Sequence, residues 1–97
     1  MRTARVIRPA TLADVPALVV MGQQFAQTEL YRDILRENPE QMAILATNLI
    51  EDESGTVLVL ERDSVLMGMI GLVCTPHFLS GDMYAGEVFW WVTPGQR

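Results

Sequence analysis

Three strand-like segments follow one another in the second half of the chain, after two helix-like segments in the first half. Residues 56–61 are nearly all apolar, which predicts a central strand buried on both faces. Residues 65–74 form its hairpin partner across a short turn, and residues 84–92 form the last strand. A short strand is also predicted at residues 5–8, because the residue before Pro9 favours extended geometry. The order β-α-α-β-β-β is typical of an α+β fold with a mainly antiparallel sheet and two helices.

Each of the two predicted helices has a proline near its start. The first begins either at Thr11, with an acid three residues later, or at Asp14, with Pro16 in the first turn. The second begins at Asn38, which precedes a proline and is a favourable cap. Gly22 lies on the apolar face of the first helix, where it costs about 1 kcal/mol relative to alanine. We therefore expect close packing or a bend at Gly22.

Composition and charge narrow the classes of partner. Ninety-seven residues are enough for one small domain. The net charge is −5 and the chain has no lysine, whereas a phosphate backbone is bound by clustered cations. Three of the seven arginines, Arg2, Arg5 and Arg8, lie near the N-terminus and are expected on the solvent face of the first strand. We therefore predict no nucleic-acid partner.

Cysteine content and hydropathy indicate the compartment. The single cysteine, Cys74, excludes an internal disulfide, which fits a reducing environment, and it is expected to fill the core. The N-terminus lacks the apolar segment of a signal peptide, and the longest apolar run is too short to cross a bilayer. Cys74 and His77 are too few for a zinc site. These features predict a cytoplasmic protein with no membrane partner and no metal.

Two short motifs at opposite ends of the chain carry a resemblance to a known family. Residues 7–14 read I-R-P-A-T-x-x-D, and residues 92–94 read V-x-P at the end of the last strand. Together with the element order, they resemble the opening half of the GNAT-type N-acetyltransferases. In that family V-x-P leads into the acyl-CoA pyrophosphate loop, R/Q-x-x-G-x-G/A, of which Arg97 would be the first letter. The resemblance implies that residues 1–97 form a single, apparently truncated domain.

The resemblance also implies a reaction. An acetyl group would pass directly from acetyl-CoA, the co-substrate, to the amine of a small-molecule or peptide acceptor. Glu87 is the predicted catalytic base, because burial in an apolar strand raises the pKa of a carboxylate towards the useful range. The alternative is an edge glutamate that points to solvent, since a shift of one residue in register would expose it.

The remaining site residues follow from the same resemblance. Trp90, Trp91 and Val92 would contact the pantetheine arm of acetyl-CoA, chiefly through backbone groups that can also polarise the thioester. Arg97 would begin the pyrophosphate loop, which binds phosphate at a helix N-terminus. Tyr31, between the two helices, would contribute to the acceptor site. The family's usual general acid lies on a later helix, so no residue is assigned that role.

A second interpretation belongs to a different class of function. The chain would then be a non-catalytic interaction domain that pairs with another chain through its last, aromatic strand. If the chain ends at Arg97, we expect a homo-oligomer formed through that strand, and we expect the 97 residues alone to be inactive.

Overall fold

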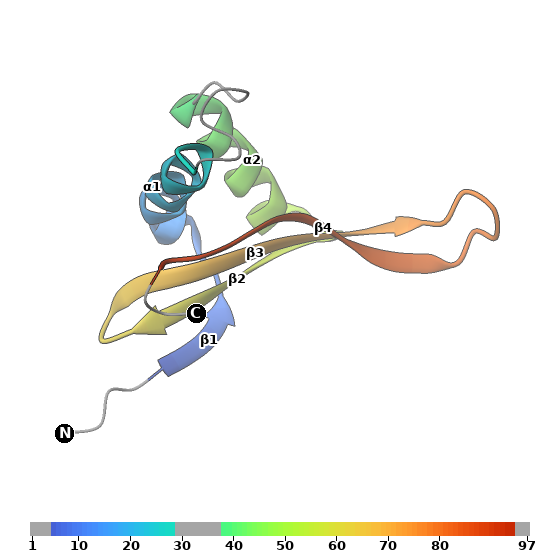
Figure 1. Ribbon diagram of the computed structural model, residues 1–97. Helices are drawn as coiled ribbons and strands as arrows, with labels where there is room; N and C mark the ends of the chain where they lie inside the picture. The colour runs from blue at the N-terminus through green and yellow to red at the C-terminus, as the bar shows by residue number, and fades with distance from the viewer. Residues whose placement is uncertain (1–4, 29–37, 95–97) are drawn as a thin grey trace.

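The computed structural model describes residues 5–28 and 38–94 of the chain, and these form two layers (Figure 1). The order of elements confirms the predicted α+β fold. The elements are β1 (Arg5–Pro9), the 3₁₀ turn η1 (Leu12–Asp14), α1 (Val15–Ala26), α2 (Pro39–Glu51), β2 (Gly55–Arg62), β3 (Val65–Pro76) and β4 (Met83–Val92).

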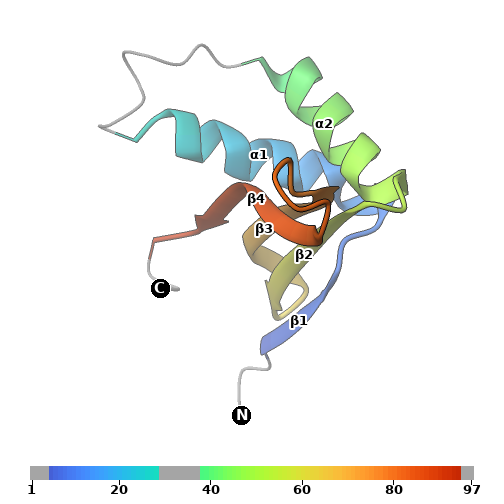
Figure 2. The same cartoon turned by 90° about the vertical axis from the view of Figure 1, so that its right-hand side faces the viewer.

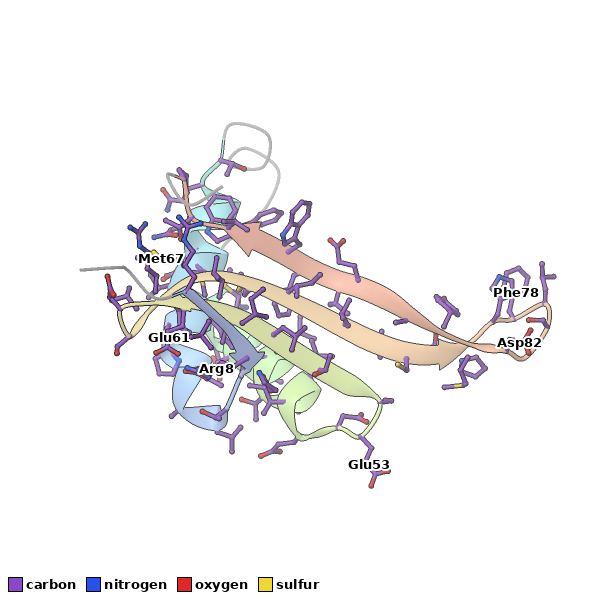
Figure 3. The ribbon with its side chains drawn as sticks, turned by 90° about the horizontal axis from the view of Figure 1, so that it is seen from below. Arg8, Glu53, Glu61, Met67, Phe78 and Asp82 are labelled. Carbon is purple, nitrogen blue, oxygen red and sulfur yellow. The ribbon has the colours of Figure 1, made fainter. Side chains whose placement is uncertain are left out.

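All four strands form one antiparallel sheet in the order β1-β2-β3-β4. Strands β2 and β3 are joined through Asp63 and Ser64, whose φ angles are 52° and 66°. Two consecutive positive φ angles are typical of the two-residue turns whose twist suits a hairpin. The β3–β4 hairpin runs well beyond the helices, with Phe78 and Asp82 at its tip (Figure 3). Within the described residues, β4 is an edge strand of this sheet.

Both helices pack on the same face of the sheet, and the core lies between the two layers (Figure 2). Val57 and Val59 on β2 are fully buried there, against side chains from both helices. Leu58 and Leu60, on the opposite face of β2, are only half-buried. The prediction that this strand is buried on both faces is therefore correct only for the face that the helices cover. No described element covers the opposite face of the strand.

The start of the first helical segment combines the two predicted alternatives. Thr11 precedes η1, and the backbone N–H of Thr11 donates to the Asp14 carboxylate over 2.8 Å. Helix α1 then begins at Val15 with Pro16 in its first turn. The second helix starts as predicted, with the Asn38 side chain accepting from the backbone N–H of Gln41. These local signals hold because each involves residues three positions apart or fewer.

Gly22 marks close packing between the helices. A Cβ atom at Gly22 would lie 2.9 Å from the sulfur of Met42, which is closer than ordinary contact. Because glycine has no side chain, α2 can approach α1 closely at this point. Gly22 and Met42 also line a cavity between the helices and the sheet.

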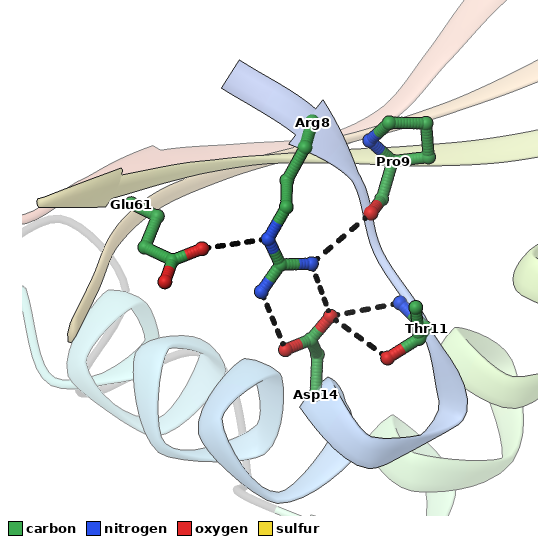
Figure 4. Close-up of polar contacts among 5 residues, drawn as sticks. All are labelled: Arg8, Pro9, Thr11, Asp14 and Glu61. Atoms are coloured by element: carbon green, nitrogen blue, oxygen red, sulfur yellow. Dashed lines mark hydrogen bonds and ion pairs between the residues drawn. The ribbon is translucent and has the colours of Figure 1, made fainter. Parts of the chain in front are cut away.

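Arg8 is not on the solvent face of β1, contrary to the prediction. Its guanidinium donates to both oxygens of Asp14, over 2.8 and 3.0 Å, and to Glu61 over 2.6 Å (Figure 4). The hydrogen bonds to the Asp14 and Glu61 carboxylates raise the pKa of Arg8. The hydrogen bonds from Arg8 in turn lower the pKa of Asp14 to about 2. Register explains the difference, because Arg8 pairs with the buried Val59 and so shares the helix face of the sheet.

Candidate functional site

The edge strand β4 carries most of the predicted site residues. Glu87 lies opposite Leu72 of β3, and its side chain is exposed. Trp90 lies opposite Ile70. Because directly paired residues share a face, both Glu87 and Trp90 are on the side of the sheet away from the helices. The described residues do not desolvate the Glu87 carboxylate, and the catalytic role of Glu87 stays a prediction.

A bulge in β4 sets this arrangement. The register shifts between Gly71 and Leu72, so that Phe89 opposes Gly71 while Glu87 opposes Leu72, and Val88 is the extra residue. Such a bulge interrupts the ladder and re-aims the neighbouring side chains. A Cβ atom at Gly71 would overlap the Phe89 ring, so the ring rests directly on the β3 backbone. Only glycine at position 71 allows this contact.

The two tryptophans have different environments. Trp91 is buried on the helix face, where its indole N–H donates to Gln24 over 3.3 Å and its ring meets Phe25 edge to face. Trp90 is 61% exposed on the other face. The alternation follows from the strand period of two. Acetyl-CoA could therefore contact Trp91 only through the backbone of this residue, whereas the side chain of Trp90 is accessible to a ligand.

An open hollow of about 550 Å³ lies where β4 ends beside the second half of α1. Trp91, Thr93 and Pro94 line it from the strand, and Gln23 and Gln24 are among the lining residues of the helix. The strand pairing continues past Val92, because the backbone N–H of Thr93 donates to the carbonyl of Met67 over 2.7 Å. The end of the V-x-P motif is therefore held against β3, and its Thr93 and Pro94 line a surface hollow together with glutamine side chains of α1.

A second, apolar cavity of about 160 Å³ lies between the helices and β4, with Phe89 and Trp90 in its wall. Sequence reasoning missed this cavity. Two glycines in the sequence could have indicated it. Gly22 leaves space for the Met42 side chain, and Gly71 leaves space for the Phe89 ring. Neither glycine reveals from sequence alone which partner it faces.

Some predicted residues lie elsewhere. Tyr31 and Arg97 fall outside the described residues, so their roles stay predictions. Cys74 is exposed on β3, which corrects its expected place in the core. His77 lies in the hairpin tip, stacked on Phe78 and edge-on to Tyr84. In the described ranges 5–28 and 38–94, no group of three or more acidic, histidine or cysteine side chains is placed to hold a metal ion. None of the helices described is long and apolar enough to cross a membrane.

Comparison with known proteins finds matches in structure. No family model matches the chain, and no curated protein matches it in sequence. A transcriptional regulator from Bacillus halodurans C-125 matches with TM-score 0.75 and 21% identity, over 97% of this chain and 63% of that one. A ribosomal-protein-alanine N-acetyltransferase from Brucella melitensis biovar Abortus 2308 matches with TM-score 0.67 and 20% identity, over 97% and 60%. A predicted acetyltransferase from Clostridium acetobutylicum, solved with acetyl-CoA, matches with TM-score 0.72 and 12% identity, over 97% and 63%.

These matches establish the fold. Aminoglycoside N-acetyltransferases are also among the matched structures. The chain spans about 60% of the length of the structures that it matches. It has the fold of the N-terminal part of the GNAT acetyltransferases.

Proposed function

We propose that this chain forms the N-terminal part of an acetyl-CoA-dependent N-acetyltransferase that acts on an amine acceptor. The observation that carries the proposal is the geometry of β4, an edge strand among the described residues, with a bulge at Val88 directly after Glu87. A strand at the edge of a sheet can offer backbone N–H and C=O groups to an extended ligand. The amide-containing pantetheine arm of acetyl-CoA is such a ligand, and the hollow at the end of β4 adjoins the same edge.

Glu87 is the proposed base in this reaction. The acceptor nitrogen attacks the thioester carbonyl carbon, and a proton passes from that nitrogen to the Glu87 carboxylate, directly or through water. The carbon–sulfur bond breaks, and the thiolate of CoA takes up a proton. Trp90, Trp91, Val92 and Arg97 are proposed to contact acetyl-CoA. Tyr31 is proposed to contact the acceptor, in a soluble, cytoplasmic enzyme that needs no metal.

Acetyl transfer itself tests the proposal. The protein expressed from its complete reading frame is incubated with acetyl-CoA and a panel of primary amines, and the released thiol is measured. We expect amine-dependent release of CoA and an acetylated product in the mass spectrum. Saturable acetyl-CoA binding without transfer to any amine would contradict the reaction, and absence of binding would contradict the proposed cofactor as well.

The role of Glu87 is tested by Glu87→Gln, with Glu53→Gln as the matched control. Both acids are exposed, but Glu53 lies in the turn after α2, far from β4 (Figure 3). Glu87→Gln is expected to lower kcat by roughly 10²–10⁴-fold with little change in acetyl-CoA affinity, and the loss should shrink as pH rises and more amine is neutral. The control should stay near the wild-type rate. A Glu87→Gln enzyme within twofold of wild type would return Glu87 to the solvent-facing interpretation.

A non-catalytic interaction domain is the second candidate, favoured by exposed apolar side chains on β4 and on the sheet face that no described helix covers. Val88 and Trp90 on β4 and Ile7 on β1 are exposed. A second copy of this chain could pair along β4 and cover Val88 and Trp90. Self-association that depends on β4, without acetyl-CoA binding, would favour this candidate.

A further inference from the structure

The tip of the β3–β4 hairpin, residues 77–83, carries exposed apolar side chains. Phe78 is 89% exposed, Leu79 78% and Met83 65%. Phe78 is the most exposed large apolar side chain among the described residues, and it lies where the hairpin projects beyond the helices (Figure 3). Apolar side chains gathered on a projecting element indicate a contact surface, because they stay in water unless a partner covers them.

The apolar cavity between the helices and the sheet has the size of a phenylalanine ring. Its lining residues come from α1, α2, β3 and β4, and none of them is charged. Its volume is about 160 Å³. Apolar protein cavities of about 150 Å³ stay dry and bind benzene. A single aromatic ring therefore fits this cavity in both size and polarity.

The cavity has a buried floor and an accessible mouth. Leu18 and Ala46 line the floor and are buried, whereas Leu45 is 43% exposed and borders the mouth. A side chain carried by another segment can therefore enter the cavity from the surface.

The Phe78 ring cannot reach the cavity of its own chain. Phe89, which lines the cavity, lies opposite Gly71 of β3, and the pairing continues for five further residues of β3, as far as Pro76. At about 3.4 Å per residue this length is roughly 17 Å. The hairpin runs away from the helices over that length (Figure 1). A ring at the tip can therefore enter only the cavity of a second molecule.

We propose that two copies of this chain associate by exchanging their hairpin tips, with Phe78 of each copy in the apolar cavity of the other. One twofold axis makes both contacts at once, because the same two surfaces are present on each copy. The contact uses neither Glu87 nor the hollow at the end of β4. It is therefore independent of the proposed reaction.

The buried area is sufficient for a stable dimer. An aromatic side chain such as Phe78 buries about 150–250 Å². With Leu79, Met83 and the facing walls of the cavity, two reciprocal contacts bury roughly 1,400 Å², and specific interfaces bury about 1,200–2,000 Å² in total. Both complementary parts lie on one chain, so a second copy supplies the whole interface.

Sedimentation equilibrium of the protein expressed from its complete reading frame measures the association. We expect a monomer–dimer equilibrium, and Phe78→Thr should raise the dimer dissociation constant at least about 30-fold, as the loss of a central interface anchor does. Ile7→Thr is the matched control, because Ile7 is a large apolar side chain that is also exposed but lies on β1, outside the tip and the cavity. Its dissociation constant should stay near that of the wild type.

The cavity is tested by Leu45→Trp, which adds bulk at the mouth and should weaken the dimer by a similar factor. Ile44→Trp is its control, because Ile44 is the preceding residue of α2, is exposed, and does not line the cavity. This control should dimerise like the wild type.

A mixture of Phe78→Thr and Leu45→Trp gives the sharpest test. Neither variant can form the contact with itself, but Phe78 of the Leu45→Trp copy can enter the intact cavity of the Phe78→Thr copy. With a fluorescent label on one variant, the mixture should show heterodimers at concentrations where each variant alone is monomeric. A folding defect gives no such rescue, and the exposed position of Phe78 keeps Phe78→Thr informative should Leu45→Trp not fold.

Three results would overturn the proposal. The first is a wild-type monomer at tens of micromolar. The second is a dimer that Phe78→Thr leaves unchanged, as expected for pairing through β4 alone, or that Ile7→Thr weakens equally. The third is a mixture of the two folded variants without heterodimers.

Discussion

Replacing Asp14 with asparagine should destabilise the protein in a way that depends on pH. The Asp14 carboxylate accepts two hydrogen bonds from the Arg8 guanidinium and one from the backbone N–H of Thr11, and its side chain is 12% exposed. The variant keeps the shape of the side chain but removes its charge. It therefore weakens the link that ties β1 to the start of the first helix.

The pKa of Asp14 gives the magnitude. The Arg8 pair lowers this pKa from 3.8 to about 2. Each unit of pKa corresponds to about 1.4 kcal/mol, and screening by solvent around the partly exposed Arg8 reduces the effect to roughly 1–2 kcal/mol at neutral pH. For a domain of this size that is about 5–15 °C in Tm.

The direction with pH follows from the lowered pKa. A carboxylate whose pKa is lower in the folded state stabilises the protein fully above its unfolded pKa, and the contribution is lost as pH falls towards the folded pKa. The difference between wild type and Asp14→Asn should therefore be largest at neutral pH, shrink below pH 3.8 and almost vanish only below pH 2.

Urea unfolding of both proteins between neutral and acidic pH measures this difference. Asp82→Asn serves as the control for loss of one negative charge, because Asp82 is exposed at the hairpin tip (Figure 3) and should change the stability little. An Asp14→Asn difference that is independent of pH, or no larger than that of the control, would refute the reasoning.

Three further predictions concern β4 and its surroundings. Gly71→Ala should lower the free energy of unfolding by about 1–3 kcal/mol, because the new methyl group would overlap the Phe89 ring; an unchanged denaturation midpoint would contradict the position of the ring. A polypeptide of these 97 residues should bind acetyl-CoA far more weakly than micromolar, because losing about three charge-assisted hydrogen bonds of the pyrophosphate loop expected after Pro94 removes on the order of 5–9 kcal/mol; micromolar affinity by calorimetry would contradict this. The same polypeptide should self-associate through β4 in light scattering, and lysine at Val88 and Trp90 should prevent it; a wild-type monomer at tens of micromolar would count against an exposed edge.

The sequence by itself determined the order and type of the elements. Asn38 caps α2 as its spacing predicted, and the turn at Asp63 and Ser64 joins two apolar strands where the pattern placed it. These features depend on a few neighbouring residues and on periods of two or 3.6, which can be read along the chain. The same local patterns were sufficient to predict the α+β fold and to indicate the resemblance to acetyltransferases.

The tertiary structure alone decided which side chains meet. Arg8 pairs with Glu61 across 53 positions, although its surroundings in sequence suggested a solvent-facing side chain. The bulge at Val88 puts Glu87 and Phe89 on opposite faces of the sheet, and the cavity forms only where α1, α2 and β4 converge. Register and packing depend on contacts between distant segments, and a shift of one residue reverses the face of every side chain in a strand. Local pattern therefore predicted where β4 lies in the chain, whereas contacts with β3 and the helices decided what each of its residues faces.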